Sequence, residues 1–275
     1  MVTNGQLILL LVATLLFAAG GGISLARLRG DRPGLRLAAK VCLYFGVCAA
    51  VGVLVWHSIY RGQWLPLEDN FDSLVWLGLL LTFFVLYVQR HRPLGGLDWF
   101  IMPIVILLFI GAAVLGRLKP EQYRVGLWYT VHTVSSFGGA IAFAIAAAVG
   151  TMYLISNRRL RKKSAVPGPN LGSLERLERL SLTAVTLGFA LLSISLITGL
   201  VKLLHEGGKT RLGSNWIASP KIILALCVWV VYALVLHAPM NPSFRGRKAA
   251  LLSIVGFLLM VGVLVAIQFM PGGKS

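Results

Sequence analysis

The chain has 275 residues, of which 57% are hydrophobic and only 13% charged, and its mean hydropathy is +0.81. Soluble domains carry about 25% charged residues, so this composition excludes an ordinary soluble enzyme and indicates a polytopic membrane protein. The net charge of +17 arises from 26 Lys and Arg residues against 9 acids. Such an excess is typical of nucleic-acid binding, of contact with anionic lipid or of topology determinants, and the positions of the charges decide between these.

Eight apolar segments follow one another along the chain, each long enough for the roughly 20 residues that cross a bilayer as a helix, and the fifth is over-long at about 30 residues. Charges, glycines or prolines bound every segment. We therefore predict an all-α polytopic membrane protein with about eight transmembrane helices in one bundle, forming a single integral membrane domain over 1–275. The predicted helices span about 5–26, 37–60, 71–90, 98–116, 125–155, 181–204, 218–238 and 249–270.

The basic residues are distributed unevenly between alternate connections. One set of connections holds 17 Lys and Arg residues and the other holds 9. By the positive-inside rule the richer set is cytoplasmic, so both termini are predicted to be extracytoplasmic. This distribution accounts for the net charge through topology and lipid bilayer contact, and we expect no nucleic-acid partner, because the cations form no single patch interleaved with aromatics.

The longest cytoplasmic connection is predicted over 157–180, a basic loop that ends in a short amphipathic helix. Leu174, Leu177 and Leu180 recur at three-residue steps there, and Ser173 can cap the start. The helix is interpreted as an interfacial lead-in to the next transmembrane segment, with docking or lipid anchoring as the alternative.

Chemistry-bearing residues are few. No Asp or Glu falls in the middle of a segment, and the chain contains no GxSxG, HExxH or glycine-rich phosphate loop. These features argue against a carboxylate proton relay and against hydrolysis, so no independent catalytic activity is expected.

Histidine is the exception, because neutral imidazole is tolerated in a membrane and ligates haem iron. His57, His132 and His205 are predicted on the extracytoplasmic side, whereas His237 falls at an inner helix end. His57 and His132 lie at similar depth, so two imidazoles on different helices could approach one iron. The alternative is that each histidine hydrogen-bonds a backbone carbonyl or a Ser or Thr of a neighbouring helix.

Two further patterns each allow two interpretations. Ser136, Ala140, Ala144 and Ala148 form a small-residue stripe, which permits close approach either of another helix or of a flat ligand such as a porphyrin. Trp216 lies in an outer connection between basic residues, as an interfacial anchor or as part of a site for an amphipathic anion.

Several ordered stretches over roughly residues 55–270 together resemble the cytochrome c assembly proteins that handle haem, including the membrane subunit of the two-component cytochrome c synthase and the HemX-like relatives. The stretches are Pro66-Leu-Glu-Asp-Asn-Phe-Asp-Ser73, His132 heading a small-residue helix, Leu174 to Gly199, Trp216, Trp229 to His237, and Arg245-Gly-Arg-Lys-Ala-Ala.

The resemblance implies an eight-helix protein of the bacterial cytoplasmic (inner) membrane that binds haem b near its outer face and presents it for attachment to apocytochrome c, with a second synthase subunit as a possible partner. His132 matches an outer-face haem-ligating histidine, and His57 matches the histidine that holds haem within the membrane, so both are candidate iron ligands. Trp216, His205 and His237 complete the candidate haem-binding set.

The chain departs from the family pattern in its outer loop, where Leu212, Trp216 and Ala218 stand at three tryptophan positions and Ser219 stands for the aspartate. This departure favours an accessory that assists cytochrome c assembly. The alternatives are a HemX-like regulator or stabiliser of haem biosynthesis acting through its cytoplasmic loops, and a small-molecule permease. A permease is disfavoured because the broken helix pairs of many transporters are not evident.

Overall fold

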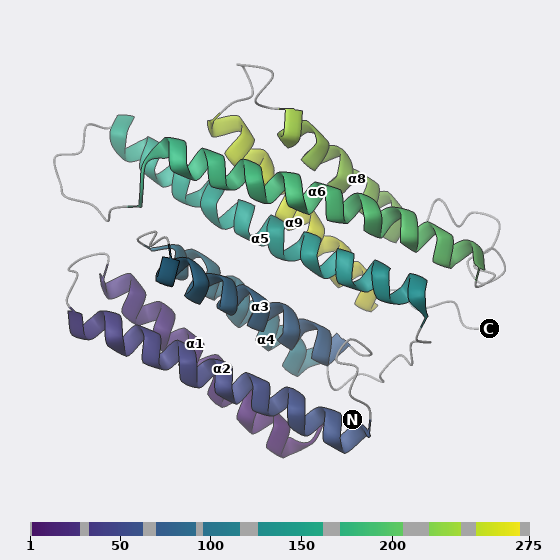
Figure 1. The fold of residues 1–275 in the computed structure, drawn as a ribbon, viewed down its shortest axis with the longest axis horizontal. Coiled ribbons are helices and arrows are strands. Elements are labelled where there is room, and N and C mark those ends of the chain that lie inside the picture. The colour runs from purple at the N-terminus through teal and green to yellow at the C-terminus, as the bar shows by residue number, and fades with distance from the viewer. Residues whose placement is uncertain are drawn as a thin grey trace. The chain divides into compact units, whose positions relative to one another are not determined.

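The fold, seen in a computed structural model, is entirely helical over the residues that the structure describes, namely 2–27, 33–62, 70–91, 96–115, 126–161, 171–205, 220–237 and 246–269. Figure 1 shows these helices in chain order. They are α1 (Asn4–Arg27), α2 (Pro33–Arg61), α3 (Asn70–His91), α4 (Leu97–Leu115), α5 (Leu127–Arg161), α6 (Leu174–His205), α8 (Pro220–His237) and α9 (Arg247–Phe269).

The helices suit a lipid environment. Within the described ranges, six are long and apolar enough to cross a membrane, and Ile222–His237 is a shorter apolar helix. Large apolar side chains also point outward, such as Ile8, Leu107 and Leu187, which are 63%, 68% and 59% exposed. Side chains of this kind are stable on the surface only against hydrocarbon. The prediction of an all-helical, multi-pass membrane protein is confirmed.

Residue contacts divide the helices into two compact units, which we describe separately. Unit 1 consists of α1 to α4, in which α1 packs on α2 and α4, and α3 packs on the same two helices. Unit 2 consists of α5, α6, α8 and α9, in which α5 packs on α6 and α9, and α8 packs on the same two helices. Each unit is therefore a ring of four helices. The boundary of a single domain over 1–275 stays a prediction.

Helix boundaries follow local chemistry. Helix α2 begins at Pro33, where a proline suits the first helical position. Helix α5 runs to Arg161, beyond the predicted end, because arginines are good helix formers and complement the negative end of the helix dipole.

The amphipathic segment predicted before the sixth span is the beginning of α6, which continues without a break from Leu174 to His205. The backbone N–H of Arg176 donates to Ser173 Oγ over 3.3 Å, so Ser173 caps this helix as predicted. Residues 162–170 of the predicted basic loop lie outside the described residues.

Helix α5 packs closely on its two neighbours in unit 2. Its residues 142–150 are all buried, and so are Ala140, Ala144 and Ala148 of the small-residue stripe. The Cβ position of Gly139 lies 3.5 Å from the carbonyl oxygen of Gly188 on α6, and that of Gly150 lies 3.1 Å from the carbonyl oxygen of Ala250 on α9. Small residues on α5 thus let its neighbours approach closely.

Two aromatic rings fill the middle of unit 2. Phe143 of α5 stacks on Tyr232 of α8 with ring centroids 3.5 Å apart. The Tyr232 hydroxyl donates to the Ser253 carbonyl of α9 over 3.2 Å, which satisfies its buried polar group. Gly188 faces Phe143 and Gly256 faces Tyr232, so each ring has a glycine against it.

Unit 1 is held at one end by a buried carboxylate. Asp98, at the start of α4, is 3% exposed and accepts hydrogen bonds from Ser24 of α1 and, over 2.9 Å, from Gln89 Nε2 of α3. Arg27 Nη1 of α1 lies 3.6 Å from the same oxygen. Asp98 therefore connects three helices, and Arg27 offsets its buried negative charge.

We predict that Asp98→Ala lowers the free energy of unfolding by about 3–5 kcal/mol, because it removes the acceptor shared by Ser24 and Gln89 and the carboxylate that faces Arg27. Unfolding by sodium dodecyl sulfate titration, followed by circular dichroism, measures this loss. Ser24→Ala is the control and should cost only about 1 kcal/mol, since it removes one hydrogen bond. Equal losses in both variants would show that Asp98 does not organise this end of unit 1.

Candidate functional site

His132 is the sixth residue of α5 and is half-buried against α6. Its ring Nδ1 lies 2.8 Å from the backbone carbonyl oxygen of Ser195. A carbonyl oxygen only accepts hydrogen bonds, so Nδ1 carries the proton and, in the neutral ring, Nε2 carries the lone pair. Histidines that bind metals are commonly held in this way, with the second ring nitrogen donating to a carbonyl.

Two serines surround this contact. Ser195 Oγ lies 2.6 Å from Ser136 Oγ and 3.3 Å from His132 Nδ1. Ser136 Oγ also donates to the His132 carbonyl over 2.7 Å. The hydroxyls tie α5 to α6 at the level of the imidazole, which holds the ring in one orientation.

Gly199, one turn beyond Ser195 on α6, leaves the space that the imidazole occupies. A Cβ at this position would lie 2.9 Å from His132 Cε1 and 3.0 Å from Nδ1, closer than a normal contact. The imidazole therefore packs directly against the backbone of α6. No pattern in the sequence indicated that Ser195 or Gly199 belongs to the site.

His57 has different surroundings, in unit 1. It is 2% exposed, and its Nδ1 lies 3.3 Å from Gln6 Oε1 of α1. The backbone N–H of Thr3 donates to the same oxygen over 2.9 Å, which fixes the orientation of the amide. His57 Nδ1 must therefore be a donor, while Nε2 faces Asp72 Oδ1 at 3.9 Å.

Two acceptor oxygens thus face the two ring nitrogens of His57, and the Phe71 ring lies 5.0 Å from its centroid. The Nε2–Oδ1 distance of 3.9 Å exceeds that of a hydrogen bond. The role of His57 as an iron ligand stays a prediction. His132 and His57, equivalent by predicted depth, are distinguished by their partners.

The other predicted site residues either lie far from His132 or fall outside the described residues. His237 ends α8, is exposed, and has Nδ1 2.7 Å from the Ala233 carbonyl of its own helix. Val235, two residues before His237, lines the same small cavity as Gly150, and Gly150 lies about 27 Å from His132 along the axis of α5. His237 and His132 therefore lie toward opposite ends of unit 2. His205 ends α6, but its side chain lies outside the described residues, as does all of Trp216.

The structure provides one imidazole donor at His132, a side chain that commonly ligates haem iron. Among the residues that the structure describes, no group of three or more His, Cys, Asp or Glu side chains lies close enough to hold a metal ion. A porphyrin supplies four equatorial nitrogens and needs from the protein only axial ligands. A single imidazole whose Nδ1–H is bound to a carbonyl meets that requirement.

Several relatives align with most of the chain. The "Cytochrome c biogenesis protein CcsA" of Porphyra purpurea is 29% identical over 286 residues, covering 86% of this chain and 86% of the relative. Proteins with the same description from a strain of Prochlorococcus marinus and from Guillardia theta are 25% and 22% identical, covering 80% and 82% of this chain and 77% and 81% of the relatives. No solved structure matches the chain.

The family description "Cytochrome C assembly protein" matches residues 64–271, which include six of the eight described helices in full together with the whole His132 site. The match thus covers well over half of the 275 residues. The chain therefore belongs to the cytochrome c assembly protein family.

Proposed function

We propose that this protein is a multi-pass membrane component of cytochrome c biogenesis that binds haem b through His132 and presents it to a partner. The observation that carries the proposal is the hydrogen bond from His132 Nδ1 to the Ser195 carbonyl, because in the neutral ring it leaves the lone pair on Nε2, as in many metal-binding histidines. When bound, haem supplies the group that becomes attached to apocytochrome c.

The residues of the site have separate tasks in this proposal. His132 binds through Nε2, the Ser195 carbonyl selects the tautomer, and Gly199 leaves room for the ring. Ser136 fixes Ser195 through their hydroxyl contact of 2.6 Å. The partners in the proposal are apocytochrome c and a second synthase subunit, and His57, His205, His237 and Trp216 remain candidates for further haem contacts.

The proposed location is the bacterial cytoplasmic membrane, with the His132 end of unit 2 extracytoplasmic. The uneven split of 17 and 9 basic residues between alternate connections supports this orientation. Within unit 2, exposed arginines such as Arg158 and Arg247 lie at the end opposite His132, as the orientation requires.

The orientation predicts the outcome of reporter fusions. A reporter active only in the cytoplasm should be active when fused after Lys163 and silent when fused after Lys209, because these positions lie in the basic-rich and basic-poor sets of connections. The reverse pattern would place His132 on the cytoplasmic side and would overturn presentation of haem at the outer face.

Haem binding is tested by absorption spectroscopy of protein purified in detergent from haem-replete cells. We expect a Soret band that His132→Ala weakens about ten-fold or more in occupancy, because the proposed iron ligand is lost. His91→Ala is the matched control and should retain the band, since His91 is exposed at the end of α3 and belongs to no candidate site. A colourless parent that takes up no haem in titration would contradict the proposal.

A second variant tests the packing of the imidazole against Gly199 without removing the ring. Gly199→Ala should weaken haem binding, since the added Cβ would displace a ring that lies 2.9 Å away. Gly139→Ala on the facing helix is the control, because its Cβ would meet its nearest neighbour at an ordinary 3.5 Å. Both changes raise helix propensity by the same amount, about 1 kcal/mol. Equal haem affinity in the two variants would show that haem binding does not depend on the observed position of the His132 ring.

A further inference from the structure

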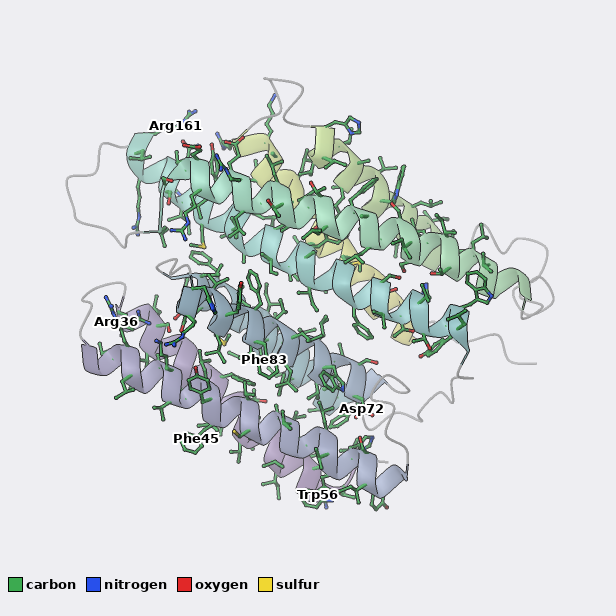
Figure 2. All side chains as sticks on the ribbon, in the orientation of Figure 1. Arg36, Phe45, Trp56, Asp72, Phe83 and Arg161 are labelled. Atoms are coloured by element: carbon green, nitrogen blue, oxygen red, sulfur yellow. The ribbon has the colours of Figure 1, made fainter. Side chains whose placement is uncertain are left out.

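Cations gather at the end of unit 2 that lies opposite His132. Three helix ends meet there, and all the basic side chains on them are exposed. Figure 2 shows one of these side chains, Arg161, at the end of α5. The set, which we call the basic end of unit 2, comprises Arg158, Arg159 and Arg161 of α5, Arg176 and Arg179 of α6, and Arg247 and Lys248 of α9.

Contacts between the helices bring these ends together. A Cβ at Gly246, directly before α9, would lie 2.6 Å from the Tyr153 hydroxyl of α5. Tyr153, Leu177 of α6 and Gly246 also line one small cavity. Arg158 lies about 8 Å beyond Tyr153 along the axis of α5, a distance that long arginine side chains span from either helix.

Few acids balance these cations. The described residues at this end include only Glu175 and Glu178 against seven basic residues. Glu175 forms an ion pair with Arg179 over 3.1 Å within α6, so it does not offset the charges of α5 and α9. The surface is left with an excess of positive charge.

Part of this excess positive charge lies at the start of α9. Arg247 and Lys248 occupy its first two positions, and its first turn contains no acidic residue. Cations are disfavoured at a helix N-terminus, where the dipole is already positive and backbone N–H groups lack partners within the helix. A bound anion would relieve this repulsion.

Exposed apolar side chains adjoin the cations. Leu160, between Arg159 and Arg161, is 66% exposed, and Leu251, one turn after Arg247, is 43% exposed. A small soluble anion would leave these leucines uncovered, and an acidic peptide offers few long apolar groups. A molecule with an anionic head and apolar tails matches both kinds of surface.

We propose that the basic end of unit 2 binds an anionic phospholipid, with the phosphate contacting Arg158, Arg161 and Arg247 and the acyl chains lying along α5 and α9. This site is independent of the haem proposal, since it lies at the other end of the unit and uses none of the His132 contacts.

Native mass spectrometry of the full-length protein in detergent tests the proposal, with phosphatidylglycerol and phosphatidylcholine of identical acyl chains as probes. We expect the parent to bind phosphatidylglycerol about ten-fold or more tightly than phosphatidylcholine, given three phosphate-facing cations. The variant Arg158→Gln/Arg161→Gln/Arg247→Gln should bind the two lipids within about two-fold of each other. Equal binding of both lipids by the parent would overturn the proposal.

The matched control is Arg36→Gln/Lys40→Gln/Arg90→Gln, which removes three cations from unit 1 and should keep the preference. Loss of the preference in this control as well would show that overall charge, not this surface, attracts the lipid.

Two measurements on the parent protein hold even if the test variant does not fold. The preference should fall steeply as salt rises from about 0.1 M to 0.5 M, because exposed charges are screened, and a salt-independent preference would refute the phosphate contacts. Excess glycerol 3-phosphate should not displace the lipid, whereas full displacement would identify a site for soluble phosphate and overturn the role of the acyl chains.

Discussion

The close packing of α6 and α9 on α5 is the constraint on which unit 2 depends. Glycines and alanines make α5 thin over residues 139–150, so neighbouring backbones approach until a Cβ at Gly150 would lie 3.1 Å from a carbonyl oxygen of α9. In hydrocarbon no hydrophobic effect drives helices together, so such packing contacts carry the association. The Phe143 and Tyr232 rings then fill the space beside the glycines that face them.

The same proximity creates the candidate site. His132 reaches a main-chain carbonyl of α6 only because the backbone of α6 passes close to α5 at Ser195 and Gly199. In unit 1, by contrast, His57 meets side chains, Gln6 and Asp72, from two helices. A carbonyl fixes one ring nitrogen as a donor, and in the neutral ring the lone pair then lies on the other nitrogen. At His57 the Gln6 amide oxygen lies 3.3 Å from Nδ1 and the Asp72 carboxylate 3.9 Å from Nε2. The two histidines therefore differ in the groups that surround them, although both lie inside helices.

Much of the fold could be predicted from the sequence because bilayer thickness sets helix length. The eight apolar segments correspond to the eight described helices, and the largest boundary differences, at the end of α5 and the start of α6, arise where arginines and a Ser173 cap extend helix beyond the apolar residues. The small-residue stripe on α5 serves helix packing, the first of its two interpretations, since Ala140, Ala144 and Ala148 are buried by the protein itself.

The site could be predicted only in part. The position of His132 within its helix indicated a candidate ligand, and hydrogen bonding to a neighbouring helix was the alternative interpretation. The structure shows the hydrogen bond to the Ser195 carbonyl of α6, and haem ligation stays a proposal. Its partner Ser195 lies 63 residues away, and Gln6 lies 51 residues from His57. Hydropathy contains no information on which turns of two helices face each other, so neither pairing was predictable.

The group that orients His132 determines which substitutions can disturb the site. The acceptor is a peptide carbonyl, which every amino acid provides, so exchanging the residue at position 195 alters the supporting hydroxyl but not the acceptor itself. A change of His132 itself, or of a residue such as Gly199 that lets the two backbones meet, acts on the contact directly. The orientation of the imidazole thus depends on the course of the α6 main chain more than on the side chain at position 195.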